Sequence, residues 1–317
     1  MKFCNSLLRL LITGGLGFIG SHLVDSLSKK SHKIMILTKT LSKKDNIKHP
    51  SSNVKIEKID LTNFKKVGQI IEKFKPDIII HLAGNTSHSK SFEEPLEDIE
   101  SNAKTTLFML EKIRELGLSC KFVLGSTFIV IGKPTKLPVT ESTPCNPTTI
   151  YGTNKLASEH FCKIYHDVYG LDTVIFRITN SYGPREQVIS TKNAVNFLIY
   201  EAFNRKEISI YNKGKFFRDF IYIDDVVSGI NVILKKGKSG ELYWISSGKK
   251  TWFYEFANIL EKNTNCKVVF PKTPTYTKKV DVGNFIVNNA KLRKLGWSPK
   301  ISINVGIKKT LDYFQSN

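Results

Sequence analysis

A glycine-rich turn between a predicted strand and a predicted helix constrains the fold of this chain more than any other feature. Gly14, Gly17 and Gly20 follow the apolar segment 9–13 and open a helical segment at 18–28. In such a turn the first glycine permits a tight bend, the second lets backbone approach a pyrophosphate, and the third lets the helix pack against the strand. The helix N-terminus also offers free N–H groups and a partial positive charge to phosphate. The sequence therefore predicts a strand–turn–helix unit that binds a dinucleotide.

Apolar strands and helical segments alternate through the first 180 residues. We expect strands at 9–13, 33–37, 77–82, 121–124 and 173–178, and helices at 18–28, 96–116 and 151–169. Strands separated by helices of this length indicate βαβ units, and right-handed crossovers arrange such units as a doubly wound parallel sheet. After residue 181 the pattern loosens around Gly183-Pro184. We therefore expect an α/β fold, with a Rossmann domain over 1–180 and about 213–238. A smaller C-terminal α/β domain would bind the substrate with residues of about 181–212 and 239–317.

Composition and charge exclude several other classes of protein. Of the 317 residues, 41% are hydrophobic and 24% are charged, which is typical of a globular protein. No apolar run approaches the roughly 20 residues that cross a bilayer, and the apolar N-terminus reads as a first strand rather than a cleaved signal. Five scattered cysteines without a Cys-x-x-Cys pair favour a reduced, cytoplasmic protein without a metal site. The formal charge of +20 comes from scattered lysines without a nucleic-acid-binding motif, so we expect neither nucleic acid nor a membrane as partner. A positive surface would still attract a diphosphate substrate.

Tyr151 and Lys155 are the candidate catalytic pair. They stand one helical turn apart in Tyr-Gly-Thr-Asn-Lys, so both side chains lie on the same face of the predicted helix. Because an isolated phenol has a pKa of about 10, a tyrosine acts as acid or base at neutral pH only where positive charge stabilises its phenolate. Ser126 and Thr127 end the preceding strand, where a hydroxyl can hydrogen-bond the reacting oxygen. Together with the glycine turn, this pattern predicts an enzyme that moves a hydride with the help of a tyrosine.

The end of the second predicted strand bears on the choice of dinucleotide. An acidic residue normally stands there and accepts hydrogen bonds from the adenine ribose. This chain has Thr38-Lys39-Thr40 instead, with two more lysines close behind and no carboxylate before Asp45. Because an acid repels a 2′-phosphate and lysines attract one, the sequence favours NADP(H). The alternative is NAD(H) held by other contacts, with lysines that only cover the surface.

These motifs, in this order, resemble the extended short-chain dehydrogenase/reductase family of nucleotide-sugar epimerases, dehydratases and 4-keto reductases. The resemblance runs over almost the whole chain: 13–21 is similar to the family's cofactor turn, 177–184 and 218–225 to its substrate motifs, and 295–299 to its C-terminal turn. It implies that Thr127, Tyr151 and Lys155 are catalytic. The cofactor contacts that it implies are Gly14, Leu16, Gly17, Phe18, Ile19, Thr38, Lys39, Asp60, Leu61, Leu82, Ala83, Tyr151 and Lys155. The substrate contacts that it implies are Ser126, Asn180, Arg218 and Lys278.

Two departures from the family pattern bear on the reaction and on diphosphate binding. Family dehydratases carry Asp-Glu directly after the catalytic threonine, whereas Phe128-Ile129 stand there in this chain. Because two apolar residues cannot shuttle protons, we do not expect a 4,6-dehydratase. Lys278 stands where many members have an arginine, so a point charge would replace a bidentate contact to the substrate's diphosphate.

The resemblance leaves two chemistries at C4 of a nucleotide-diphosphate sugar. A 4-keto-6-deoxyhexose reductase consumes NADPH, whereas a 4-epimerase keeps its NAD bound and returns the hydride to the rotated keto sugar. The Thr38-Lys39 departure favours the reductase, and the epimerase is the alternative. A non-catalytic, cofactor-sensing regulator is a third possibility, which typically loses the tyrosine or the lysine that this chain retains.

The family also implies a homodimer that pairs through helices of the two protomers. The helix predicted over 96–116 carries a candidate apolar stripe for that contact, formed by Leu107, Phe108, Leu110 and Ile113. The alternative is that these side chains only face the sheet of their own protomer.

Overall fold

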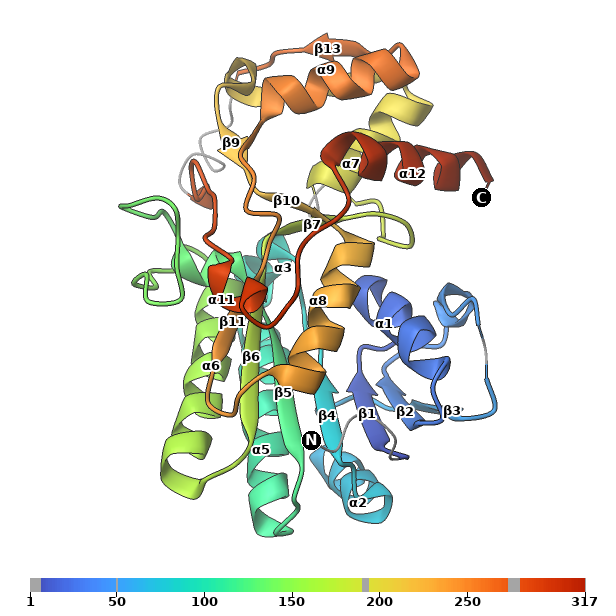
Figure 1. Ribbon diagram of the computed structural model, residues 1–317, viewed down its shortest axis with the longest axis vertical. Coiled ribbons are helices and arrows are strands. Elements are labelled where there is room, and N and C mark those ends of the chain that lie inside the picture. The colour runs from blue at the N-terminus through green and yellow to red at the C-terminus, as the bar shows by residue number, and fades with distance from the viewer. Residues whose placement is uncertain (1–6, 50, 190–193, 273–279, 317) are drawn as a thin grey trace.

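A seven-stranded sheet forms the centre of the larger part of the molecule (Figure 1). The computed structural model describes residues 7–49, 51–189, 194–272 and 280–316. The strands of the sheet are β1 (Arg9–Thr13), β2 (Lys33–Thr38), β3 (Val54–Lys58), β4 (Ile78–His81), β5 (Lys121–Thr127), β6 (Thr173–Ile178) and β11 (Leu242–Ile245). Their order is β11-β6-β5-β4-β1-β2-β3, and every neighbouring pair is parallel. The chain reverses direction across the sheet between β1 and β4, so the predicted doubly wound sheet is confirmed, with its switch point at the end of β1.

Helices cover both faces of this sheet. α1 (Phe18–Ser28) and α8 (Ile223–Lys236) pack against each other on one face, and α2 (Phe64–Phe74), α5 (Thr105–Glu115) and α6 (Ile150–Tyr169) cover the other. The side chains of β1 point alternately into two hydrophobic cores, one on each face of the sheet. Leu10 and Ile12 pack with α1 and α8, and Leu11 packs with α2 and α5. This alternation is the period of two that a strand buried on both faces requires.

A helical stretch with a π-helical segment follows β4. It consists of α3 (His88–Glu93), α4 (Pro95–Asp98) and the π-helical segment Ile99–Lys104, which runs directly into α5. π-Helical turns are rare and often occur at functional sites. Here the segment packs against the loop that follows β4 at the switch point, where the Asn102 side chain donates to the Asn85 carbonyl at 3.1 Å.

A smaller layer of helices and short strands lies over the carboxyl ends of the sheet strands (Figure 1). Its helices α7 (Ala194–Asn204), α9 (Phe253–Thr264) and α12 (Ile303–Ser316) pack on one another. Its strand pairs are β7 (Asn180–Tyr182) with β10 (Phe220–Tyr222), β8 (Glu207–Ser209) with β13 (Lys267–Val269), and β9 (Phe217–Arg218) with β12 (Thr251–Trp252). The short helix α11 (Ala290–Arg293) packs beside β11.

One strand of the large sheet comes from the range that we assigned to the smaller domain. β11 pairs with β6 in parallel register, from Leu242 opposite Ile175 to Ile245 opposite Ile178, and forms the edge of the sheet. The second segment that we assigned to the Rossmann domain, about 213–238, therefore has to be extended to include this strand. Apart from β11, the division of the chain into two domains stays a prediction.

Part of the predicted dimer stripe lies inside the protomer. Leu110 and Ile113 are fully buried in the core between α5 and the sheet, because that face of α5 packs on β4 and β5 side chains. They therefore cannot contact a second protomer, and their assignment to the stripe is wrong. Leu107 and Phe108 are half-buried against the same core.

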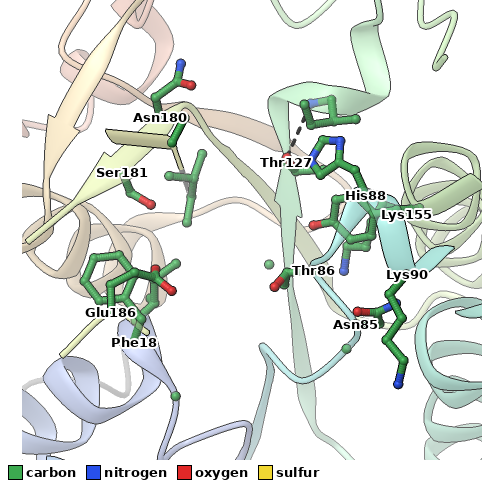
Figure 2. A pocket seen from close by; sticks show the side chains of 18 of the residues that line it. Phe18, Asn85, Thr86, His88, Lys90, Thr127, Lys155, Asn180, Ser181 and Glu186 are labelled. Atoms are coloured by element: carbon green, nitrogen blue, oxygen red, sulfur yellow. Dashed lines mark hydrogen bonds between the residues drawn. The ribbon is translucent and has the colours of Figure 1, made fainter. Parts of the chain in front are cut away.

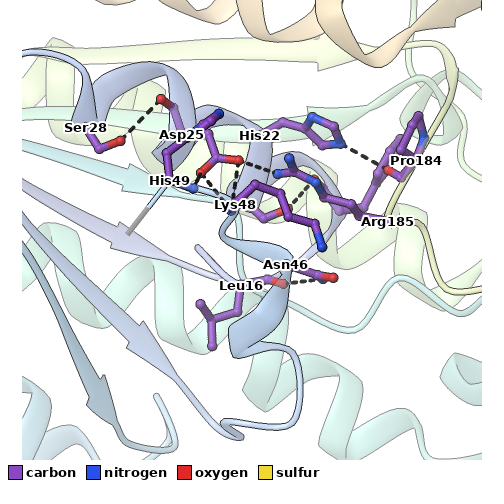
Figure 3. A network of polar contacts seen from close by, with 11 residues as sticks. Leu16, His22, Asp25, Ser28, Asn46, Lys48, His49, Pro184 and Arg185 are labelled. Carbon is purple, nitrogen blue, oxygen red and sulfur yellow. Dashed lines mark hydrogen bonds and ion pairs between the residues drawn. The ribbon is translucent and has the colours of Figure 1, made fainter. Parts of the chain in front are cut away.

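A buried carboxylate joins α1 to the start of the smaller layer (Figure 3). Asp25 of α1 forms an ion pair with Arg185, with Oδ2 and Nη1 2.7 Å apart and both side chains about nine-tenths buried. The other Asp25 oxygen accepts the backbone N–H groups of Lys48 and His49 at 3.1 Å each. Arg185 lies just after β7. This network therefore fixes the start of the smaller layer against α1, the helix that follows the glycine turn.

Candidate active site

A cavity of about 1670 Å³ runs across the carboxyl edge of the sheet, from the glycine turn to the smaller layer. Figure 2 shows side chains from both parts of the molecule facing it. Every predicted site residue that the structure describes lines this cavity. They are Gly14, Leu16, Gly17, Phe18, Ile19, Thr38, Lys39, Asp60, Leu61, Leu82, Ala83, Ser126, Thr127, Tyr151, Lys155, Asn180 and Arg218. Lys278 lies outside the described residues.

The glycine turn has the geometry of a phosphate-binding turn. Gly14 adopts a left-handed φ of 69°, and its carbonyl accepts the Gly17 N–H at 2.9 Å. A Cβ at Gly20 would collide with that same carbonyl, so only glycine lets α1 start this close to β1. No side chain caps the N-terminus of α1, where Gly17 is the N-cap. Its first N–H groups are thus free to bind a pyrophosphate, and the turn fits a dinucleotide.

The catalytic candidates meet where β5 ends and α6 begins. Thr149 caps α6 by accepting the Gly152 N–H at 3.0 Å, which fixes the first turn of the helix. Burial raises the pKa of Tyr151, and a hydrogen bond with Thr127 acts in the opposite direction. Burial lowers the pKa of Lys155 to about 8, with Glu159 opposing that shift. The predicted triad therefore lies together, with a neutral phenol beside an ammonium group that titrates close to physiological pH.

A buried network behind the triad was missed by the sequence analysis. Ser126 donates its hydroxyl to Glu159 Oε1 at 2.5 Å, and Arg177 forms an ion pair with Glu159 at 2.6 Å. Because the Ser126 hydroxyl already donates to Glu159, this serine fixes the end of β5 relative to α6. The signal in the sequence was Glu159 itself, one helical turn after Lys155 on the same face.

A second buried carboxylate, also missed, links the loop after β4 to α6. Asp98 is almost fully buried and accepts the side-chain amides of Asn85 at 2.8 Å and Asn154 at 2.7 Å. Asn154 stands between Tyr151 and Lys155 in the chain. Asp98 therefore ties α6, which carries Tyr151 and Lys155, to the cavity loop.

The adenosine end of the cavity contains Thr38 and Lys39, which stand at the end of β2 where an acidic residue is usual. Lys39 Nζ lies 3.0 Å from Asp60 Oδ2 and 4.0 Å from Glu97 Oε1. The Thr38 hydroxyl donates to the Thr40 carbonyl at 2.9 Å. The charge of Lys39, one of the lysines expected to attract a 2′-phosphate, is thus already opposed by two carboxylates.

The opposite end of the cavity contains the predicted substrate residues. Asn180 opens β7 and donates its side-chain amide to the Asp219 carbonyl at 3.3 Å. Arg218 lies 2.5 Å from Asp281 and also donates to the Gly283 carbonyl. Arg218 therefore presents its guanidinium beside a partly exposed carboxylate, in the position where a diphosphate would be expected.

A family model described as GDP-mannose 4,6 dehydratase matches residues 11–310 of this chain. The chain belongs to this family of extended short-chain dehydrogenases/reductases. The nucleotide-sugar enzymes that it resembles include a putative UDP-glucose 4-epimerase of Methanocaldococcus jannaschii, 30% identical over 97% of this chain and 99% of that protein. A dTDP-D-glucose 4,6-dehydratase of Homo sapiens is 31% identical over 98% of this chain and 90% of its own length.

The family assignment extends to the three-dimensional structure. The UDP-glucose 4-epimerase of Thermus thermophilus, solved in complex with NAD, superimposes with a TM-score of 0.86 at 27% identity and covers 97% of this chain and 99% of its own. The extended short-chain dehydrogenase/reductase predicted from the motifs is thereby confirmed, and the chain is an enzyme of the nucleotide-sugar class. In the described part of the chain, no helix is long and apolar enough to cross a membrane, and no group of three His, Cys, Asp or Glu side chains is placed to hold a metal ion.

Proposed function

We propose that this enzyme is a nucleotide-sugar 4-epimerase that works with bound NAD(H) and uses Tyr151 as the acid/base. The observation that carries the choice is the pairing of Lys39 with Asp60 and Glu97, at 3.0 and 4.0 Å. A lysine opposed by two carboxylates gives a 2′-phosphate little net attraction, so the main argument for NADP(H) weakens. The Thermus thermophilus epimerase, whose structure contains NAD, supports the same choice.

In the proposed reaction Tyr151 moves a proton at the C4 oxygen of the sugar. The phenolate takes the hydroxyl proton while the C4 hydride leaves, and the phenol returns that proton when the hydride comes back to the other face of the keto sugar. Thr127, hydrogen-bonded to Tyr151, would hold the same oxygen. Lys155, one helical turn away, would hold the nicotinamide ribose and favour the phenolate by its charge. Bound NAD(H) would supply the hydride acceptor and donor.

The residues after Thr127 support hydride return over elimination. Phe128 packs edge-on against Phe285, with ring centroids 5.2 Å apart, and Ile129 is buried. Neither side chain can transfer a proton to or from C5 or C6 of a keto sugar. This is why we do not propose a 4,6-dehydratase, although the family model takes its name from one.

A 4-keto-6-deoxyhexose reductase using NADPH is the second candidate. One specific observation favours it: β2 ends at Thr38 and Lys39 follows, without the carboxylate that usually binds the adenine ribose. Both candidates share Tyr151, Thr127 and Lys155 and the same substrate contacts, Asn180 and Arg218. Both would also act as cytoplasmic homodimers, as the family resemblance implies.

Analysis of the dinucleotide that copurifies with the protein separates the two candidates. We expect denaturation of fresh protein to release stoichiometric NAD(H), and we expect the enzyme to interconvert UDP-glucose and UDP-galactose without added cofactor. The Tyr151→Phe variant should lose this activity by at least about a hundredfold while it retains the dinucleotide. An empty protein that prefers NADPH at least tenfold and reduces a 4-keto-6-deoxy nucleotide sugar would establish the reductase instead.

A further inference from the structure

His88 is a cavity residue to which the catalytic triad gives no role. It is the first residue of α3, and its ring packs on the ring of Tyr151 with centroids 5.6 Å apart and planes 47° apart. Figure 2 shows it on the same side of the cavity as Thr127 and Lys155. His88 therefore lies beside the group expected to act on the C4 oxygen.

Both ring nitrogens of His88 lack a hydrogen-bond partner among the described residues. Its ring contacts the ring of Tyr151. Burial lowers the pKa of His88, and the nearby Asp98 carboxylate opposes that shift only in part. The imidazole is therefore neutral at physiological pH and offers one N–H donor and one acceptor to the cavity. A half-buried polar group of this kind is stabilised when a ligand that displaces water supplies a hydrogen bond.

The loop that carries His88 is fixed before any ligand arrives. Asn85 donates to Asp98 at 2.8 Å and accepts the Ser87 N–H at 3.1 Å, and Ser87 caps α3 by accepting the Lys90 N–H at 3.2 Å. Because Asp98 also holds Asn154 on α6, the same carboxylate positions His88 and Tyr151. The imidazole is thus presented in a preorganised position, as a recognition group must be if it is to discriminate between ligands.

We propose that His88 hydrogen-bonds a sugar hydroxyl next to the reacting C4 and so determines which sugars are accepted. This inference rests on the proposed function, in which Thr127 and Tyr151 bind the C4 oxygen. A group that packs on the Tyr151 ring then faces the neighbouring positions of the sugar, O3 or O6. A site built to hydrogen-bond a hydroxyl rejects the analogue that lacks it more strongly than an apolar pocket rejects an added group.

The test compares binding of UDP-glucose with binding of its 3-deoxy and 6-deoxy analogues. Wild-type enzyme with bound NAD, His88→Phe and His88→Asn are titrated by calorimetry. His88→Phe keeps a ring against Tyr151 but removes both nitrogens, and we expect it to weaken UDP-glucose binding about tenfold or more. His88→Asn should regain part of that loss. One analogue, 3-deoxy or 6-deoxy, should bind wild type and His88→Phe equally, which identifies the hydroxyl that His88 contacts.

His160→Phe is the matched control, because His160 is exposed on the far side of α6. It should bind all three sugars as wild type does. Equal weakening of UDP-glucose and both analogues in His88→Phe would mean that the ring only supports the loop, and unchanged binding would mean that it takes no part; either result overturns the inference. Turnover is measured in parallel. If wild-type enzyme binds with this selectivity but does not invert the configuration at C4, the proposed epimerase activity is wrong and the role of His88 in sugar binding stands.

Discussion

The two ends of the cavity are built in different ways. At the cofactor end, Gly14, Gly17 and Gly20 form a turn within one short stretch of chain. Most of its hydrogen bonds are between backbone groups, and the Asn46 side chain adds one to the Leu16 carbonyl. At the substrate end, Arg218 meets Asp281 across 63 positions, and buried Asp219 accepts N–H groups of Ser247, Gly248 and Val287. The cofactor end therefore depends on local backbone geometry, whereas the substrate end depends on side chains that only the completed fold brings together.

Replacement of Gly20 tests the cofactor end most severely. In Gly20→Ala the new Cβ collides with the Gly14 carbonyl oxygen, which is backbone and cannot swing aside. We expect the free energy of unfolding to fall by about 3 kcal/mol or more and NAD binding to be lost, as measured by urea denaturation and fluorescence titration. Gly68→Ala, in α2, places its Cβ at ordinary contact distance from the flexible end of Lys112 and the edge of the Phe108 ring, and should be neutral or stabilise by up to about 1 kcal/mol. Comparable losses in both variants would contradict the local-geometry argument.

Replacement of Arg218 tests the substrate end alone. Arg218→Gln removes the cation beside Asp281, and we expect UDP-glucose affinity to fall about 10- to 100-fold, since charge-assisted contacts to phosphate are strong. NAD affinity should stay within about twofold of wild type. Lys308→Gln, which removes an exposed charge on α12, controls for the general positive field. If NAD and UDP-glucose affinities fell together, the two ends would not be separable.

Lys155 lies at the junction of the two ends and should give the binding of NAD a pH dependence. Burial lowers its pKa to about 8, so the ammonium is charged below pH 8 and loses its proton above it. We therefore expect NAD affinity of the cofactor-free protein to decrease by up to about tenfold between pH 7 and pH 9.5. Lys155→Met should bind weakly at every pH. A wild-type affinity that stays flat, or rises with pH, would argue against a role for this charge.

Lys39 should have the smallest effect. It is exposed, and a surface ion pair such as Lys39–Asp60 contributes about 0.2–1 kcal/mol. Lys39→Ala should therefore change NAD affinity by less than about fivefold, whereas Asp60→Asn, which frees the lysine, should raise NADPH affinity relative to NADH. Parallel titrations with NADH and NADPH measure both, with Lys65→Ala as a surface control. A strong loss of NADPH binding in Lys39→Ala, from a wild type that prefers NADPH, would instead favour the reductase.

The same contrast explains what could be predicted from the sequence. Helix 18–28 and strands 9–13 and 173–178 were predicted with their observed bounds, because glycine and apolar periodicity act through neighbouring residues. β11 was missed because nothing near it in the chain indicates β6 as its partner. The position of Glu159 one turn after Lys155 was a signal, but it did not indicate that Arg177 is its partner. Lys39 was predicted to attract a 2′-phosphate, and its pairing with Asp60 became visible only when β2 and β3 lay side by side. His88 followed from no motif at all; only its packing on Tyr151 drew attention to it.

The Asp25–Arg185 ion pair has a consequence for how the two ligands affect each other. α1 begins at the turn expected to hold the pyrophosphate, and Arg185 follows the strand that carries Asn180, the proposed sugar contact. A ligand that orders one of these segments is expected to order the other through the buried pair, so each ligand would then bind more tightly when the other is present. Thermodynamic reciprocity requires the factor to be the same in both directions. For an epimerase that must not release its dinucleotide between half-reactions, such coupling would make cofactor dissociation slowest while the keto sugar is bound.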